Sequence, residues 1–257
     1  MTTLDLAASP LLDRTPTKAS TTAWAKKAQF LGRLTGILFI LTFITSIPPV
    51  FSLYVPVLSD PAYILGAGST TGLSWGAVLE LLLIIANIGS AVAIFPVAKR
   101  ENEGLALGFI ASRIVESAFI GVGILCLLAI GTLRLTAAGA DPAALTVIGK
   151  ALVAVHDWSF RVGPGVVCGI GNGMILGYLM WRTRLVPRWL SILGLVGGPL
   201  IVISGLAVVL GVIEGGSVAQ GIATIPEFFW ELGFGLWAAI MGFNPKAVTR
   251  LENSVSV

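Results

Sequence analysis

The sequence predicts an all-α polytopic membrane protein, a bundle of about six transmembrane helices with one extra amphipathic helix on the outside. Three observations predict this fold class. Of the 257 residues, 56% are hydrophobic and 11% are charged, whereas an ordinary soluble domain is about 25% charged. The mean hydropathy is +0.93, which leaves too little polar surface for a soluble domain of this length. The apolar residues also fall into runs that are long enough to cross a bilayer as helices.

The apolar runs give the expected elements in order. Residues 1–27 are rich in Thr, Ser and Ala and have no sustained apolar period, so we expect a disordered cytoplasmic tail there. The first span is expected at 30–47, ending at Pro48 and Pro49 because proline lacks a backbone donor. Each further span is near or above the roughly 17 residues that cross the hydrocarbon core. These spans are 73–97, 105–133, 166–181, 189–213 and 225–243.

The basic residues predict the orientation. Twelve Lys and Arg side chains flank the expected spans on one side of the membrane. The opposite side carries only Arg134, Lys150 and Arg161. Because basic residues concentrate in cytoplasmic segments, we expect both termini inside the cell. The transmembrane domain is then 28–243, followed by a cytoplasmic C-terminal tail, 244–257.

The segment 141–161 is apolar enough to cross the membrane, but a seventh crossing would move the basic residues after 181 to the outside. We therefore expect an external helix, with Asp141 as its N-cap and an apolar stripe at Leu145, Ile148, Leu152, Val155 and Ser159. The chain is then expected to break at Gly163-Pro164-Gly165 and to re-enter the membrane as the fourth span.

Glycines recur at every fourth position along the fourth span. They are Gly165, Gly169, Gly173 and Gly177. This spacing predicts a flat groove that the backbone of another helix can approach closely. The approaching helix belongs either to the same chain or to a second copy, so a homo-oligomer through this helix is one expectation.

Polar side chains inside the apolar spans are the candidates for a functional site, because a charge at the bilayer centre costs at least about 2.5 kcal/mol. On the expected topology most of them converge on the outer half of the membrane. A single polar cavity open to the outside would account for them. The candidates are Glu80, Asn87, Arg113, Glu116, His156, Asp157, Asn172, Glu227 and Glu231.

Some of these candidates have a local structural interpretation instead. Thr224 and Glu227 match a capping box at the start of the last span. Glu80 and Glu231 have no local partner of this kind, so they are the two strongest candidates for function.

Two pairs of candidates are spaced as ion pairs on one helix face. Asp157 precedes Arg161 by four residues, and Arg113 precedes Glu116 by three. Side chains at these spacings are neighbours on a helix surface. Each pair is therefore expected to neutralise its own charges, which is a structural role.

Several kinds of chemistry are excluded or weakened. His156 is the only histidine, which argues against a histidine-rich zinc site and against Ser–His catalysis. The net charge is only +3, with basic residues spread between the spans, and this does not support nucleic-acid binding. Cys126 and Cys168 lie in apolar stretches without metal-type spacing, so we interpret them as small buried hydrophobes. No cofactor is predicted, and a carboxylate-rich metal site stays open.

Several segments resemble one family of bacterial membrane proteins. They are RLTGILFILTFITSIP, LELLLIIANIGSAVAIFPVAKRENEGLALGFIASRIVESAFIGVGILCLLAI, VHDWSFRVGPG, GNGMILGYLM and TIPEFFWELGFGLWAAIMGF. Together they look like the domain of unknown function 4386, over about residues 28–243. The resemblance implies a six-helix topology and a bacterial plasma membrane, and it implies no activity or substrate.

Three functions stay open. The first is a carrier or sensor for a small solute, a cation or protons, using Glu80, Glu116 and Glu231 with His156 above them. The second is a membrane-embedded enzyme that acts on a lipid-type substrate, with Glu231 or Glu80 as acid or base near His156. The third is a non-catalytic assembly protein that binds a partner helix through the glycine groove. The lipid bilayer is the one partner that all three share.

Overall fold

The computed structural model describes residues 18–66 and 69–254, and within these ranges the chain forms helices and no strand. Five helices are long and apolar enough to cross a membrane. They are Ala23–Leu53, Thr71–Ala98, Glu103–Thr136, Pro142–Thr183 and Arg188–Val209. The predicted fold class, an all-α polytopic membrane bundle, is confirmed. Residues 1–17 of the expected N-terminal tail lie outside the described residues.

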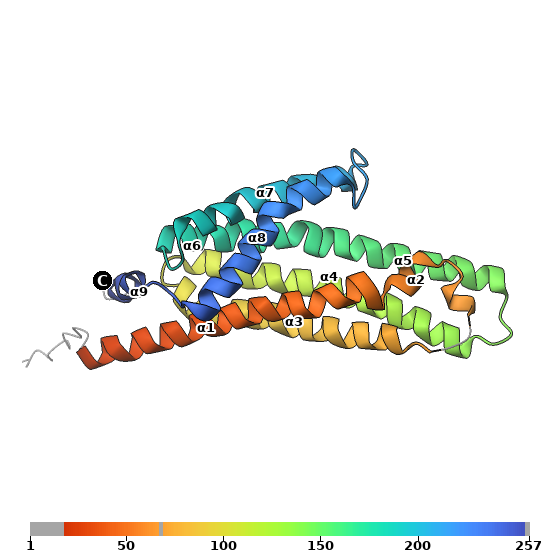
Figure 1. The fold of residues 1–257 in the computed structure, drawn as a ribbon, viewed down its shortest axis with the longest axis horizontal. Coiled ribbons are helices and arrows are strands. Elements are labelled where there is room, and N and C mark those ends of the chain that lie inside the picture. Colours follow the sequence, from red (N-terminus) through yellow and green to blue (C-terminus); the bar gives the residue numbers. More distant parts are fainter. Residues whose placement is uncertain (1–17, 67–68, 255–257) are drawn as a thin grey trace, which may run out of the picture.

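The elements follow one another as an up-and-down bundle. In chain order they are α1 (Lys18–Pro48), η1 (Pro49–Leu53), α2 (Val55–Ser59), η2 (Tyr63–Leu65), α3 (Thr71–Ala98), α4 (Glu103–Thr136), α5 (Pro142–Val162), η3 (Gly163–Val167), η4 (Gly169–Leu176), α6 (Gly177–Thr183), α7 (Arg188–Val209), α8 (Val218–Ile240) and α9 (Pro245–Asn253). Helices α3, α4 and α5 run along the long axis, and α7 and α8 cover only part of their length (Figure 1).

The first helix differs from the prediction at both ends. It begins at Lys18, inside the segment expected to be a disordered tail. It also continues past Pro48 and Pro49 as the π-helical turn η1, in which the backbone N–H of Tyr54 donates to the carbonyl of Pro49 at 2.9 Å. A proline inside a helix can kink it without ending it, and the proline pair here is followed by a wide turn instead of a break.

The prediction of a break at Gly163-Pro164-Gly165 is also wrong. Helical structure continues from Pro142 to Thr183, and the chain passes through the glycines as the π-helical segments η3 and η4. At 1.5 Å per residue, these 42 residues span about 63 Å, roughly twice the hydrocarbon core. The outer half of this long helix, together with the end of α4, extends beyond the turn between α7 and α8 (Figure 1).

The helix α5, which was expected to lie outside the membrane, begins as predicted and buries part of the predicted stripe. The side chain of Asp141 accepts a hydrogen bond from the N–H of Ala143 at 3.1 Å, which confirms the N-cap. Ile148 and Val155, expected in the buried stripe, are more than 40% exposed. Leu145 and Ser159 of the predicted stripe are buried, and Gly149 and His156 are buried with them.

The last predicted span, 225–243, corresponds to α8, which is not among the five helices identified by length and apolarity. It begins earlier than predicted, because Ser217 is its N-cap and accepts a hydrogen bond from the N–H of Gln220. The capping-box interpretation of Thr224 and Glu227 is therefore wrong, since Glu227 lies more than two turns inside the helix. A count of six crossings stays a prediction.

Both described ends of the chain lie at the same end of the molecule (Figure 1). The segment expected as a C-terminal tail contains the amphipathic helix α9, whose Val248 and Leu251 are buried. Arg250 donates to the backbone carbonyl of Thr183 at 2.5 Å, and Arg100 donates to that of Leu251 at 3.3 Å. This helix therefore closes one end of the bundle.

Candidate functional site

A cavity of about 290 Å³ lies between α1, α3, α4, α8 and the π-helical part of the long helix. Hydroxyl groups of Thr42, Ser46 and Thr224 line it, and its charged, amide and thiol side chains come from four of these elements: Asn87, Arg113, Glu116, Cys168, Glu227 and Glu231. Its rim is apolar, and Phe51 and Phe228 on that rim are 76% and 42% exposed. The cavity thus joins a polar floor to an apolar opening at the outer surface of the bundle.

Arg113, Glu116 and Asn87 form one side of the floor. The Arg113 guanidinium lies 2.7 Å from a carboxylate oxygen of Glu116, so the ion pair predicted from their spacing is present. Arg113 also donates to the side-chain carbonyl of Asn87, and the amide nitrogen of Asn87 donates to Glu116 at 3.3 Å. All three side chains are at most 5% exposed. Each of these groups therefore has a hydrogen-bonding partner.

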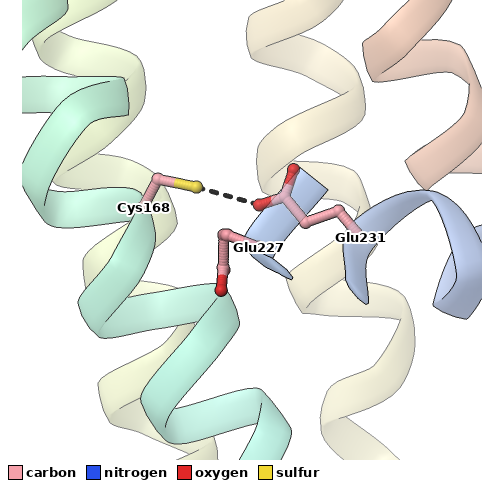
Figure 2. Close-up of side chains that lie close together, drawn as sticks. All are labelled: Cys168, Glu227 and Glu231. Atoms are coloured by element: carbon pink, nitrogen blue, oxygen red, sulfur yellow. Dashed lines mark hydrogen bonds between the residues drawn. The ribbon is translucent and has the colours of Figure 1, made fainter. Parts of the chain in front are cut away.

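Glu231, Cys168 and Asn172 form the other side. The thiol of Cys168 donates to Oε1 of Glu231 at 2.9 Å, and the amide nitrogen of Asn172 donates to the same oxygen. Figure 2 shows Cys168 and Glu231 pointing toward one another from their two helices, with Glu227 beside them. The indole of Trp230 donates to the backbone carbonyl of Asn172 at 2.8 Å and holds this part of the chain in place.

Glu227 differs from its neighbours because neither of its carboxylate oxygens has a hydrogen-bond partner among the described residues. Its side chain is only 2% exposed. A Cβ atom at Gly173 would lie 2.5 Å from Oε2 of Glu227, and one at Gly197 would lie 2.8 Å from it. Two glycines thus leave room for a buried carboxylate that has no partner among the described residues, although an unpaired buried charge is costly.

The sequence of the long helix explains why Cys168 and Asn172 reach Glu231. Pro164 cannot donate a backbone hydrogen bond, and the surrounding glycines have low helix propensity, so wide π turns replace regular α turns here. Cys168 lies between the two π-helical segments, and Asn172 lies inside the second. Such turns inside α-helices are frequent at functional sites.

The glycine groove is filled by α7 of the same chain. A Cβ atom at Gly169 would lie 2.8 Å from the carbonyl oxygen of Gly198, and one at Gly205 would lie 2.7 Å from that of Gly165. Close packing of two backbones, which the glycine spacing predicts, therefore occurs within the chain. The glycine face of the long helix is therefore covered by α7.

A second polar cluster, named the outer cluster, lies farther than the cavity from the end of the bundle that α9 closes, where α3 meets η1 and α5 (Figure 1). The hydroxyl of Tyr54 donates to Oε2 of Glu80 at 2.9 Å, and the rings of Tyr54 and His156 meet edge to face at 6.0 Å. Oε1 of Glu80 and Nε2 of His156 have no hydrogen-bond partner among the described residues. Leu83 and Ile120, which line the cavity, pack with Ala77 and Ile124 in one apolar cluster.

Residues 34–242 match the family described as Domain of unknown function (DUF4386). The chain belongs to this family. The match covers more than half of the chain and includes both polar clusters. No curated protein matches the chain, and no solved structure matches it.

In this DUF4386 chain the nine predicted site residues do not share a single cavity. Five of them line the cavity, and Asn172 contacts Glu231 beside it. Glu80 and His156 belong to the outer cluster. Asp157 lies 3.4 Å from His156 and lines a separate cavity of about 180 Å³. The predicted Asp157–Arg161 pair is absent from the described contacts, because Arg161 lies over the ring of Trp158 instead.

The prediction overlooked Tyr54 and Cys168. Tyr54 lies in a segment expected to be a loop, and only the folded chain brings its hydroxyl to Glu80. For Cys168 a signal existed, since it precedes Asn172 by four residues and Glu227 precedes Glu231 by four, which places each pair on one helix face. The prediction did not use this pattern, because it treated Cys168 only as a small buried hydrophobe.

Proposed function

We propose that this membrane protein binds a small cation, either protons or a metal ion, in the cavity floor and acts as a carrier or a sensor for it. The observation that carries the proposal is a charge imbalance. Glu116, Glu227 and Glu231 line the cavity with three carboxylates, and Arg113 is the single basic residue among its lining residues. Two carboxylates are therefore in excess of the guanidinium.

An excess of buried negative charge is costly in a membrane interior unless protons or a cation neutralise it. Arg113 is already paired with Glu116 at 2.7 Å. Glu231 receives neutral donors from Cys168 and Asn172, and Glu227 has no partner among the described residues. The Glu227 and Glu231 carboxylates are thus the part of the floor that a cation would stabilise most.

A lipid-type substrate is the second candidate, because the rim of the cavity is apolar. Ile47, Val50 and Phe51 of the first helix and Phe228 of α8 line this rim, and all four are exposed. An acyl chain on this rim would place a polar headgroup on the floor. The cation is preferred because the floor carries excess negative charge, which would repel the phosphate of an anionic lipid.

We also propose that the protein lies in a bacterial plasma membrane with both termini in the cytoplasm. The location is what membership of the family suggests. The orientation is supported by the basic residues, such as Arg100, Arg182 and Arg250, which gather at the end of the bundle that α9 closes.

The experiment that tests the proposal is a thermal unfolding series of the purified full chain in detergent, from about pH 4 to pH 9, with and without Na⁺, Mn²⁺ and Zn²⁺. A ligand that binds only the native state raises the melting temperature. We expect a cation or proton to raise it by about 5 °C in the wild type. The shift should be lost in Glu231→Gln and in Glu227→Gln.

Glu80→Gln is the matched control, because Glu80 is as buried as Glu227 but belongs to the outer cluster. It should keep the shift. If no cation and no change in pH shifts the wild type differently from the Glu227→Gln and Glu231→Gln variants, the cation proposal is rejected. A shift obtained only with a lipid would support the second candidate.

A further inference from the structure

We infer that Cys168, Glu227 and Glu231 form a binding site for a divalent transition-metal ion of the zinc class. The inference rests on the proposed cation-binding function and names the cation. The three residues come from two elements that are far apart in sequence, the long helix at Cys168 and α8 (Figure 2). Within the described residues they are the one group of three Cys, His, Asp or Glu side chains close enough to share a metal ion.

The spacing of the three side chains suits a metal ion. Their potential ligand atoms all lie within 4.8 Å of one another. In a tetrahedral site with bonds of about 2.0 Å to oxygen and 2.3 Å to sulfur, neighbouring ligand atoms lie roughly 3.3 to 3.7 Å apart. The Cys168 thiol and the Glu231 carboxylate are already 2.9 Å apart. Small side-chain rotations would therefore bring the three atoms to bonding positions.

Asn172 supplies an independent observation that points to a ligand. Its side chain is fully buried, and its Oδ1 has no hydrogen-bond partner among the described residues. The amide nitrogen, by contrast, contacts both the Cys168 sulfur, at 3.5 Å, and Glu231. A half-turn of this amide exchanges nitrogen and oxygen, and Oδ1 then faces the centre of the group. Asn172 would thus become a fourth ligand when a cation replaces the hydrogen bond.

Glu227, like Asn172, has buried oxygen atoms that could bind a ligand. Both of its oxygens are unpartnered among the described residues, whereas Glu80 accepts from Tyr54 and Glu116 is paired with Arg113. Glu80 and Glu116 thus each have a hydrogen-bond donor on at least one oxygen, which Glu227 lacks among the described residues. A metal ion would provide the missing partner of Glu227.

The donor set favours one class of metal. A thiolate is a soft ligand that selects zinc-like ions over Mg²⁺ and Ca²⁺, and carboxylate and amide oxygens suit harder ions. A mixed set of one sulfur and two or three oxygens therefore favours a borderline ion such as Zn²⁺ or Co²⁺. On binding, the Cys168 S–H bond breaks, the sulfur bonds to the metal, and the proton passes to solvent, so binding should weaken as the pH falls.

The test uses Co²⁺ as a coloured substitute for Zn²⁺ and the purified full chain in detergent. Cobalt bound to a thiolate gives a sulfur-to-metal charge-transfer band in the near ultraviolet. We expect this band in the wild type, its displacement by Zn²⁺, and a rise in melting temperature with either ion. The affinity should fall about 100-fold in Cys168→Ser and at least about 10-fold in Glu231→Gln.

Cys126→Ser is the matched control, because Cys126 is equally buried and lies outside the group. It should keep the band and the affinity of the wild type. It also removes the second thiol without touching the site, so a band in this variant assigns the thiolate to Cys168 even if Cys168→Ser does not fold.

Two results would overturn the inference. One is a wild-type protein that gives no thiolate band with Co²⁺. The other is a metal-induced rise in melting temperature that is the same in the wild type and in Cys168→Ser. Stabilisation by Na⁺ or protons that depends on Glu231 but not on Cys168 would reject the metal site and leave the proposed cation binding intact.

Discussion

Tyr54 illustrates, for a single residue, how this chain accommodates a buried carboxylate. Its ring packs against Gly76, where a Cβ atom would lie 2.8 Å from Cζ of the ring. Its hydroxyl donates to Glu80, which is fully buried. Burial raises the pKa of Tyr54 above its ordinary value of 10.0, and the adjacent Glu80 carboxylate raises it further. The phenol therefore stays neutral in the folded protein at a pH at which it ionises in the unfolded chain.

We expect Tyr54→Phe to lower the free energy of unfolding by about 1.5 kcal/mol at neutral pH, because it removes a hydrogen bond to a buried carboxylate. The raised pKa gives the sign of the pH dependence. The contribution of Tyr54 is complete below about pH 10 and is then lost at about 1.4 kcal/mol per pH unit. Chemical unfolding of both proteins, from neutral pH to about pH 11, measures this difference.

Tyr178→Phe is the control for this measurement, because Tyr178 is 39% exposed. It should change the free energy of unfolding by less than about 0.5 kcal/mol. A difference between wild type and Tyr54→Phe that stays constant up to the highest pH would contradict the role given to the buried phenol.

Among the helices, the long helix packs against α7 through glycines. Some of these glycines also leave space for the Glu227 side chain. A Cβ atom at Gly173 would overlap the Cα atom of Gly198 and would lie 2.5 Å from Oε2 of Glu227. At Gly177, one turn later, the nearest atom would be 3.3 Å away. The same glycine repeat therefore contains positions of very different tolerance.

Gly173→Ala is expected to destabilise the protein by about 2 kcal/mol, since backbone atoms must move to admit the methyl group. Gly177→Ala should cost clearly less. Unfolding in detergent with increasing denaturant measures both variants. Gly221→Ala is the control, because Gly221 is in α8 with open space around it, and this change should stabilise the helix by about 0.5 to 1 kcal/mol. Equal costs at Gly173 and Gly177 would contradict this account of the packing.

For the molecule as a whole, the arrangement of the chain ends gives a testable topology. Helix α9 closes the end of the bundle at which α1 begins, and the α4–α5 loop with Gly139 lies at the opposite end (Figure 1). With both termini in the cytoplasm, a fluorescent protein fused after α9 should fluoresce in a bacterial host. Alkaline phosphatase fused there should be inactive, because it matures only outside the cytoplasm.

Alkaline phosphatase inserted at Gly139 is the matched comparison and should be active. This residue has a positive φ of 83° and open space around it, so an insertion there should not disturb the packing. An active enzyme at the C-terminus together with an inactive one at Gly139 would reverse the proposed orientation.

Local sequence patterns are sufficient to establish the class of the molecule and the positions of its helices. Long apolar runs and low charge are local properties, and a bilayer imposes helices on such runs because every backbone group must be satisfied within the segment. Each predicted span overlaps a helix of the folded chain, and Glu227, Glu231 and Asn172 were among the nine polar residues that the sequence pattern singled out. The Arg113–Glu116 pair was also predicted, since a spacing of three residues on one helix places the two side chains next to each other.

Which polar groups meet depends on the packing of the folded chain. The contacts of Cys168 with Glu231 and of Tyr54 with Glu80 join residues 63 and 26 positions apart, and they depend on how two helices are rotated against each other. Pro48-Pro49 and Gly163-Pro164-Gly165 are typical of helix breaks. In the folded chain, π-helical turns carry the helix past both of them. Local propensity predicts that such sites are weak, and packing against neighbouring helices decides whether they break or bend.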